Sequence, residues 1–174
     1  MFVTDCRMCA LRDRCIKPVP GIGEGPLMLV GEYPSWQDDK KGECYVGREG
    51  DLIKTLLKEA EIHSYRLTNL VKCNPGYKGE VEQEHIDKCK GWLWSEIKQY
   101  KPKVIVTLGK IPAVALLKLK KSQVMSEIVR CGQLVNWDDN MIWVHPWYSP
   151  GYIQNNTKVF WDSKGFFKRI KGLL

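Results

Sequence analysis

The sequence predicts an α/β protein with a three-layer α/β/α architecture around a central, mostly parallel sheet of four strands. Short apolar segments alternate with amphipathic helical segments, a pattern typical of a wound α/β sheet. The chain has 174 residues, 44% of them hydrophobic, which is enough for one core and too few for two full domains. We therefore expect a single domain over residues 1–174, with an irregular N-terminal arm over residues 1–26.

Four segments have the composition of strands. Residues 27–31 and 103–108 are apolar runs that end at or before a glycine, and residues 66–71 are mostly β-favouring. Residues 141–144 form a further short apolar run before a His-Pro pair. Strands that are apolar along their whole length are typical of parallel sheets covered on both faces.

Helices are expected between these strands. In residues 51–62, Leu52, Leu56 and Ala60 recur at helical spacing, and residues 84–100 repeat the pattern. Residues 111–120 are also expected to be helical, with Pro112 in the first turn, where proline is tolerated. Residues 160–174 are expected to form a closing helix. Because ligands of such sheets bind beyond the carboxyl ends of the strands, we expect residues 31–47, 69–79 and 145–151 to converge.

The charge and the cysteine content limit the class of protein. The net charge of +7 and the pI of about 9.0 favour a polyanionic partner, although solvated helix faces explain any single lysine cluster equally well. No signal-peptide pattern or apolar run of membrane-spanning length is present. We expect a cytoplasmic protein without a membrane partner, and in a reducing compartment clustered cysteines are more often metal ligands than disulfides.

Four of the seven cysteines have a spacing that suits a metal centre. Cys6 and Cys9 form a two-residue-spaced pair in the arm, Cys73 follows a strand, and Cys89 lies in the next helix. Four thiolates suit tetrahedral zinc or an iron-sulfur cluster, and spacing alone does not choose between them. Unrelated thiols remain the alternative. The other three cysteines are Cys15, Cys44 and Cys131.

Candidate catalytic residues lie near the strand ends. His145, at the end of an apolar strand, is a candidate, although a lone histidine is more often structural. Glu32, Asp38 and Asp39 lie in a segment that also carries Tyr45. The segment is either a solvated loop or a pocket in which tyrosine stacks on a planar ligand and a carboxylate orients water.

Eight segments form an ordered series along the chain. They are Cys6-x-x-Cys9-x-Leu11, Leu29-Val-Gly-Glu-Tyr-Pro34, Gly42-Glu-Cys-Tyr-Val-Gly-Arg-Glu-Gly50, Leu67-Thr-Asn-Leu-Val-Lys-Cys-Asn-Pro75, Cys89, Lys101-Pro-Lys-Val-Ile-Val-Thr-Leu-Gly109, Arg130-Cys-Gly132 and His145-Pro146. In this order they resemble the family 4 uracil-DNA glycosylases, the iron-sulfur branch of the superfamily. The resemblance covers most of the chain.

The resemblance implies a fold, a cofactor and a reaction. It implies a uracil-DNA glycosylase-like fold with a structural 4Fe-4S cluster on the four cysteines Cys6, Cys9, Cys73 and Cys89. The implied reaction is hydrolysis of the N-glycosidic bond of uracil, or of a related damaged or modified pyrimidine, in DNA during base excision repair. The base would first be extruded from single- or double-stranded DNA into a pocket. The enzyme is expected to be a monomer in the cytoplasm at the nucleoid, or in the host cytoplasm if it is viral.

The resemblance also assigns roles to residues. Tyr45 matches the aromatic residue that stacks on the base, and Asn69 the asparagine that reads the uracil edge. His145 matches the histidine that would hydrogen-bond the departing uracil oxygen. Glu32 and the Asp38-Asp39 pair match acidic positions near the attacking water.

The chain departs from the family pattern at its first motif. The family has a small residue and a glycine where this chain has Tyr33 and Ser35, so that the Tyr33 ring contacts the substrate site. A second hypothesis follows: a catalytically altered DNA-binding protein of phage or mobile-element origin that excises no base. A zinc or redox module without a DNA function is the third.

Overall fold

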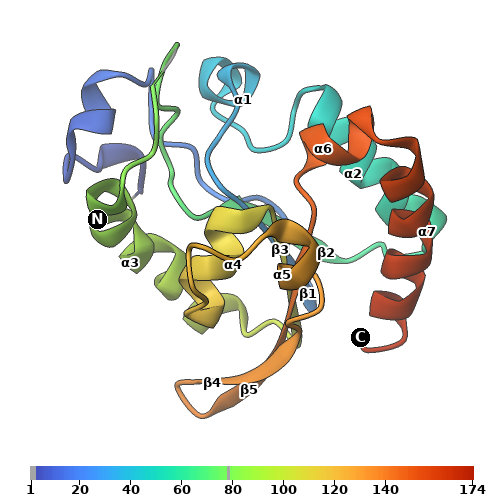
Figure 1. Cartoon of the computed structure of the whole chain (residues 1–174). Coiled ribbons are helices and arrows are strands. Elements are labelled where there is room, and N and C mark those ends of the chain that lie inside the picture. Colours follow the sequence, from blue (N-terminus) through green and yellow to red (C-terminus); the bar gives the residue numbers. More distant parts are fainter. Residues whose placement is uncertain (1–2, 78) are drawn as a thin grey trace.

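A computed structural model describes residues 3–77 and 79–174, so that the first two residues of the expected arm lie outside the described part. The five-stranded sheet has the order β2-β1-β3-β5-β4 (Figure 1). Helices cover both faces, which confirms the predicted α/β class and its mostly parallel sheet.

The four predicted strands are all present. They are β1 (Leu27–Gly31), β2 (Tyr65–Asn69), β3 (Val104–Leu108) and β5 (Asn140–Trp147). β1 pairs in parallel with β2 and β3, and β3 pairs in parallel with β5. Every residue of β1 and β3 is buried, as expected for parallel strands covered on both faces.

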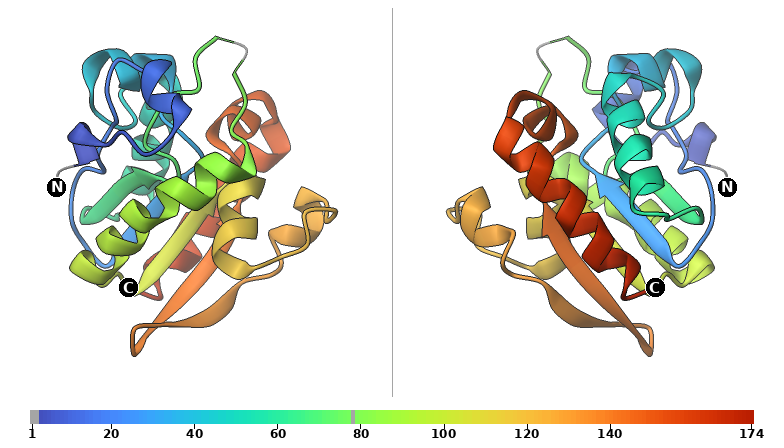
Figure 2. Two further views of the ribbon diagram at one scale, coloured as in Figure 1. Left: turned by 90° about the vertical axis from the view of Figure 1, so that its left-hand side faces the viewer. Right: turned by 90° about the vertical axis from the view of Figure 1, so that its right-hand side faces the viewer.

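The fifth strand was not predicted. β4 (Gln133–Trp137) pairs antiparallel with β5 at the edge of the sheet, and its residues are exposed or half-buried. Its mixed composition therefore lacks the apolar signal of the inner strands. Asp138 and Asp139, both at positive φ (48° and 64°), form the two-residue turn of the hairpin, a conformation that aspartate tolerates. The hairpin projects from the end of the sheet opposite α1 (Figures 1 and 2).

One face of the sheet is covered by α2 (Arg48–Glu59), α6 (Pro150–Asn155) and α7 (Thr157–Lys171). Their apolar side chains pack with one side of β1 and β3 in a core that includes Leu57, Ile153 and Phe167. The helices α2 and α7 correspond to two of the predicted amphipathic segments, with boundaries shifted by about three residues toward the N-terminus.

The other face is covered by α3 (Gln83–Tyr100), α4 (Lys110–Leu117) and the N-terminal arm. The arm carries two short 3₁₀ helices, η1 (Val3–Asp5) and η2 (Ala10–Asp13), and Leu11 packs fully buried in this second core. The arm lies against α3 (Figure 1). A short helix, α5 (Met125–Ile128), precedes β4. Within the described residues, none of the helices has the length and apolar character needed to cross a membrane.

A further short helix, α1 (Trp36–Lys41), follows β1. It begins with a capping box, in which Ser35 and Asp38 bond each other's backbone N–H groups, and it ends at Gly42 in the left-handed conformation (φ 72°). The cap fixes the direction of the chain directly after β1, where the strand ends meet.

Candidate functional site

A wide cleft opens at the carboxyl ends of the parallel strands. Its residues come from the ends of β1, β2 and β3, from α1 and the start of α2, and from the segment after β5. They are Gly31, Glu32, Tyr33, Ser35, Gln37, Asp38, Tyr45, Gly47, Arg48, Glu49, Gly50, Asn69, Leu108, Ser149, Pro150, Gly151 and Gln154. Of the three segments that were expected to converge, residues 31–47 line the cleft at many positions, residues 69–79 only at Asn69, and residues 145–151 at 149–151.

The floor of the cleft lies at Gly31, the last residue of β1. A Cβ atom there would overlap with the amide oxygen of Asn69 and with the hydroxyl of Tyr45, so only glycine lets both polar groups meet at the strand end. Asn69 and Tyr45 are buried, and the Asn69 amide nitrogen donates to the Sγ of Cys44 at 3.6 Å. The remaining polar edge of this amide can bind the edge of a planar ligand.

Tyr45 is held by its backbone. It adopts a positive φ of 58°, an uncommon conformation for a tyrosine. Its carbonyl oxygen accepts from Nζ of Lys54 at 2.9 Å, and a Cβ at Gly50 would overlap with the same carbonyl. Burial raises the pKa of the Tyr45 hydroxyl well above 10, so that the group remains a neutral hydrogen-bond donor.

Asp38 and Asp39 both bond backbone groups. Besides capping its own helix, Asp38 accepts from the N–H of Val46 at 2.8 Å. Asp39 accepts from the N–H groups of Ile16 and Lys17 at 3.0 and 3.2 Å, and it does not line the cleft. The two aspartates therefore position the loop of Tyr45 and the N-terminal arm.

Two other carboxyl groups line the cleft with no hydrogen bond or ion pair to any described residue. Glu32 follows β1, and Glu49 lies in the first turn of α2. Burial raises the pKa of Glu32, and burial together with the negative charge of Asp38 raises the pKa of Glu49. Tyr33 lies near both, since burial and the charges of Glu32 and Glu49 raise the pKa of its hydroxyl.

His145 is not among the residues that line the cleft. It pairs with Val106 in the sheet, two residues before the end of β3, which is about 6.5 Å back from the strand end. Its ring stacks on Trp143 at 5.8 Å between ring centroids, and a Cβ at Gly132 would lie 2.8 Å from its Nδ1. Burial lowers the pKa of His145. β5 continues through Trp147, and the chain reaches the cleft only at Ser149.

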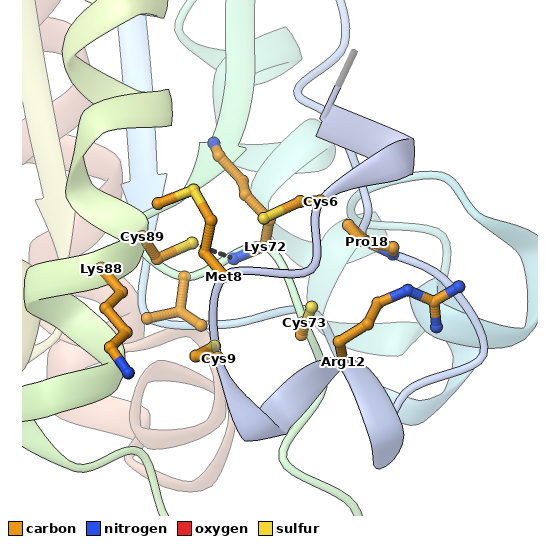
Figure 3. A pocket seen from close by; sticks show the side chains of 10 residues that line it. Cys6, Met8, Cys9, Arg12, Pro18, Lys72, Cys73, Lys88 and Cys89 are labelled. Carbon is orange, nitrogen blue, oxygen red and sulfur yellow. Dashed lines mark hydrogen bonds between the residues drawn. The ribbon is translucent and has the colours of Figure 1, made fainter. Parts of the chain in front are cut away.

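The four cysteines of the expected metal centre surround a second, smaller hollow (Figure 3). Cys6 and Cys9 come from the arm, Cys73 from the loop after β2, and Cys89 from α3. Cys6, Cys73 and Cys89 are buried. Within the described residues, no three Cys, His, Asp or Glu side chains form a group that could hold one metal ion. The sulfur atoms stand around the hollow and do not converge on one point.

Hydrogen-bond donors point at these sulfur atoms. The backbone N–H of Lys72 donates to Cys89 at 3.2 Å, and the indole N–H of Trp92 donates to Cys6 at 3.4 Å. Burial raises the pKa of Cys89 to about 11 and raises that of Cys73 further. Buried thiols of this kind ionise only beside a positive charge such as a metal, while N–H donors of this kind stabilise the resulting thiolates. The donor set therefore fits a thiolate-bound metal group.

A buried ion-pair network lies between β2 and α3. The side chain of Lys72 is 1% exposed, and its Nζ bonds Thr68 at 2.6 Å and Glu96 at 2.9 Å. Arg66 approaches the other oxygen of Glu96 at 3.4 Å. Burial opposes ionisation of Glu96, but Lys72, Thr68 and Arg66 together lower its pKa.

Four residues that line the cleft were not predicted from the sequence: Arg48, Glu49, Ser149 and Gln154. Charged residues are common at helix starts, so the sequence does not indicate that Arg48 and Glu49 line a cleft. Ser149-Pro150 is a helix-start pattern that could have marked where β5 gives way to α6. The adjacent His-Pro pair suggested an earlier end of the strand.

The chain is similar to known proteins along most of its length. The family model of the uracil DNA glycosylase superfamily matches residues 21–171. A type-4 uracil-DNA glycosylase of Sulfurisphaera tokodaii is 32% identical over 98% of this chain and 81% of the relative. The type-4 enzyme of Thermotoga maritima is 32% identical over 88% of this chain and 80% of the relative. That of Saccharolobus solfataricus is 29% identical over 99% and 83%.

Proposed function

The chain belongs to the uracil DNA glycosylase superfamily, and from this membership we propose that it hydrolyses the N-glycosidic bond of uracil in DNA, as a type-4 enzyme of base excision repair. The observation that carries the proposal is the meeting of the Asn69 amide and the Tyr45 side chain over Gly31, on the floor of the cleft. The floor presents a hydrogen-bonding edge beside an aromatic ring.

The floor suits a uracil base that has been extruded from the DNA stack. An amide side chain offers one donor and one acceptor, which complement the carbonyl oxygen and the N3–H of uracil. Cytosine presents an amino group and an unprotonated nitrogen at the same positions, so that its pattern is reversed. Asn69 therefore reads the base, and the ring of Tyr45 packs on it.

The rim of the cleft suits the sugar and the phosphates. Glu32, close to the floor, stabilises the positive charge that develops on the sugar as the glycosidic bond breaks. The Ser149 hydroxyl, at the edge of the cleft, donates to the departing base oxygen, the role that the family resemblance gave to His145. Arg48, exposed on the rim, binds a phosphate.

Cys6, Cys9, Cys73 and Cys89 hold a 4Fe-4S cluster in this proposal. The four thiolates, which line one hollow and receive N–H donors at Cys6 and Cys89, would hold the cluster. The cluster's chemistry is structural, because hydrolysis transfers no electron. It ties the arm to the loop after β2 and to α3.

The test is cleavage of oligonucleotides that carry one deoxyuridine, in single- and double-stranded form, followed by alkali to break abasic sites. The wild-type protein should release uracil, and Asn69→Ala should lower the single-turnover rate about a hundredfold or more, since both hydrogen bonds to the base are lost. Asn136→Ala, on the distant β4, is the matched control and should cleave at the wild-type rate.

The opposite outcome is equally clear. If the wild-type protein binds DNA in a salt-sensitive manner but leaves uracil in both substrates, the glycosylase proposal fails and the DNA-binding alternative replaces it.

A further inference from the structure

We propose that Glu49 is a catalytic residue, the general base that takes a proton from the water molecule attacking the sugar. The inference deepens the proposed glycosylase function and rests on it. Neither the sequence motifs nor the comparisons assign a role to this glutamate.

The two aspartates of α1 already accept hydrogen bonds from the backbone. Asp38 accepts from the backbone N–H groups of Ser35 and Val46, and Asp39 accepts from two N–H groups of the arm. A carboxylate with its oxygens engaged in this way is a poor acceptor for a further proton. Glu32 and Glu49 are the cleft carboxyls without such bonds among the described residues.

Glu49 lies on the opposite side of the cleft from Asn69 and Tyr45. Asn69 and Tyr45 meet at the end of β1, next to β2. The carboxylate of Glu49 instead reaches the segment after β5, where a Cβ at Gly151 would lie 2.8 Å from its Oε1. The order β2-β1-β3-β5 places this contact across the end of β3 from the floor. In the proposed complex, the sugar of a base held at Asn69 lies on this side of the cleft.

The solvent exposure and the raised pKa of Glu49 also suit a general base. Glu49 is open to solvent through the cleft, so that a water molecule reaches its carboxylate before DNA covers the rim. Although the residue as a whole is exposed, partial burial of its carboxyl group and the charge of Asp38 raise its pKa, and a more basic carboxylate accepts a proton more readily. No described side chain competes for it.

The proposed step balances as follows. The water oxygen forms a bond to C1′ of the deoxyribose while one of its protons passes to the Glu49 carboxylate. The C1′–N1 bond breaks, and its electron pair leaves with the uracil as an anion. The products are an abasic sugar and, after proton uptake from solvent, uracil. Glu49 then returns its proton to solvent.

Glu49→Gln tests the step, because it keeps the shape of the side chain and removes the base. Under single-turnover conditions on a deoxyuridine oligonucleotide, the rate should fall about 10²- to 10³-fold, the usual contribution of a general base. Affinity for an oligonucleotide with 2′-fluorodeoxyuridine, which resists cleavage, should stay within about twofold. Asp51→Asn, an exposed residue of the same helical turn, is the matched control and should match the wild type.

Two further readouts separate a base from a structural residue. The wild-type rate should fall at acidic pH as the carboxylate becomes protonated, and this dependence should disappear in Glu49→Gln. Added formate should restore part of the rate of Glu49→Ala, because a small carboxylate can occupy the vacated space.

The contrary outcomes are distinct. A Glu49→Gln enzyme within about threefold of the wild-type rate, or slow Glu49 variants with an unchanged pH profile and no formate rescue, would overturn the role of Glu49 and leave the glycosylase function standing. A wild-type protein that releases no uracil would overturn both.

Discussion

At the scale of single residues, the polar groups near the strand ends are of two kinds: those that bond the backbone and those that face the open cleft. Asp38 and Asp39 belong to the first kind, and Asn69, Glu32 and Glu49 to the second. The sequence could indicate that acidic residues gather after β1. It could not indicate which of them the backbone N–H groups occupy, because this depends on how loops distant in the chain pack together.

Ser149 lines the cleft and His145 does not. The end of β5 could not be located from composition, because His145-Pro146-Trp147 reads as a strand end although the strand continues through it. Trp147 stacks on Phe166 at 4.0 Å between ring centroids and donates to Ser163, which extends the strand into the core. The chain turns into the cleft only after this anchor.

We therefore expect Ser149→Ala to lower the single-turnover rate of uracil release about ten- to a hundredfold, since a donor to the departing oxygen is lost. His145→Gln should release uracil at close to the wild-type rate, because its side chain does not line the cleft. The measurement is the rate on one deoxyuridine oligonucleotide. A large loss in His145→Gln with an unchanged unfolding temperature would contradict this assignment.

At the scale of elements, apolar or β-favouring runs predicted β1, β2, β3 and β5, and apolar residues at helical spacing predicted α2, α3 and α7; α4 was also predicted. The elements that were missed carry weak signals. β4 is an exposed edge strand, and α1 has six residues and no apolar stripe. Such elements form because their caps and tertiary partners fix them, which a local pattern does not contain.

The link between β2 and α3 depends on the network of Lys72, Glu96 and Arg66. Glu96→Gln should lower the free energy of unfolding at pH 7 by about 3–5 kcal/mol, because Lys72 would remain charged and buried without its carboxylate. Urea denaturation measures the change. Glu84→Gln is the matched control in the same helix, since its ion pair with Lys88 is exposed and its loss should hardly change stability.

The same network predicts a dependence on pH. The pKa of Glu96 is lower in the folded protein than its ordinary value of 4.5. Its contribution to stability is therefore present above pH 4.5 and is lost as the pH falls through the folded pKa. Urea midpoints between pH 6 and pH 3 should decline less steeply in Glu96→Gln than in the wild type. Parallel declines would show that Glu96 does not carry this dependence.

At the scale of the whole molecule, the four cysteines around the second hollow come from the arm, from the loop after β2 and from α3. The arm also contributes apolar side chains to both cores, since Leu11 and Val19 are both 0% exposed. The four cysteines could be selected from the sequence because their pattern and the family resemblance agree. The N–H donors of Lys72 and Trp92 could not, since they arise from packing.

We expect the purified protein to contain about four iron atoms per chain and to show the broad visible absorbance of an iron-sulfur cluster. Cys9→Ser and Cys73→Ser should lose most of the iron and the absorbance, because a thiolate ligand is removed. Cys131→Ser, near the β4–β5 hairpin, is the control and should keep both. Stoichiometric zinc in the wild type would contradict the cluster assignment.

The two adjacent aspartates of α1 connect two segments that are distant in the sequence. Asp39 accepts hydrogen bonds from the arm that carries Cys6 and Cys9, while Asp38 accepts one from the loop that carries Tyr45. The amide of Asn74, next to Cys73, donates to the carbonyl of Pro34 at 2.7 Å and ties the same region to the cleft. Hydrogen bonds to two adjacent residues of α1 therefore connect the arm of Cys6 and Cys9 with the loop of Tyr45. In the proposed enzyme, loss of the cluster would therefore disturb the loop of Tyr45 as well as the arm, although the hydrolysis transfers no electron.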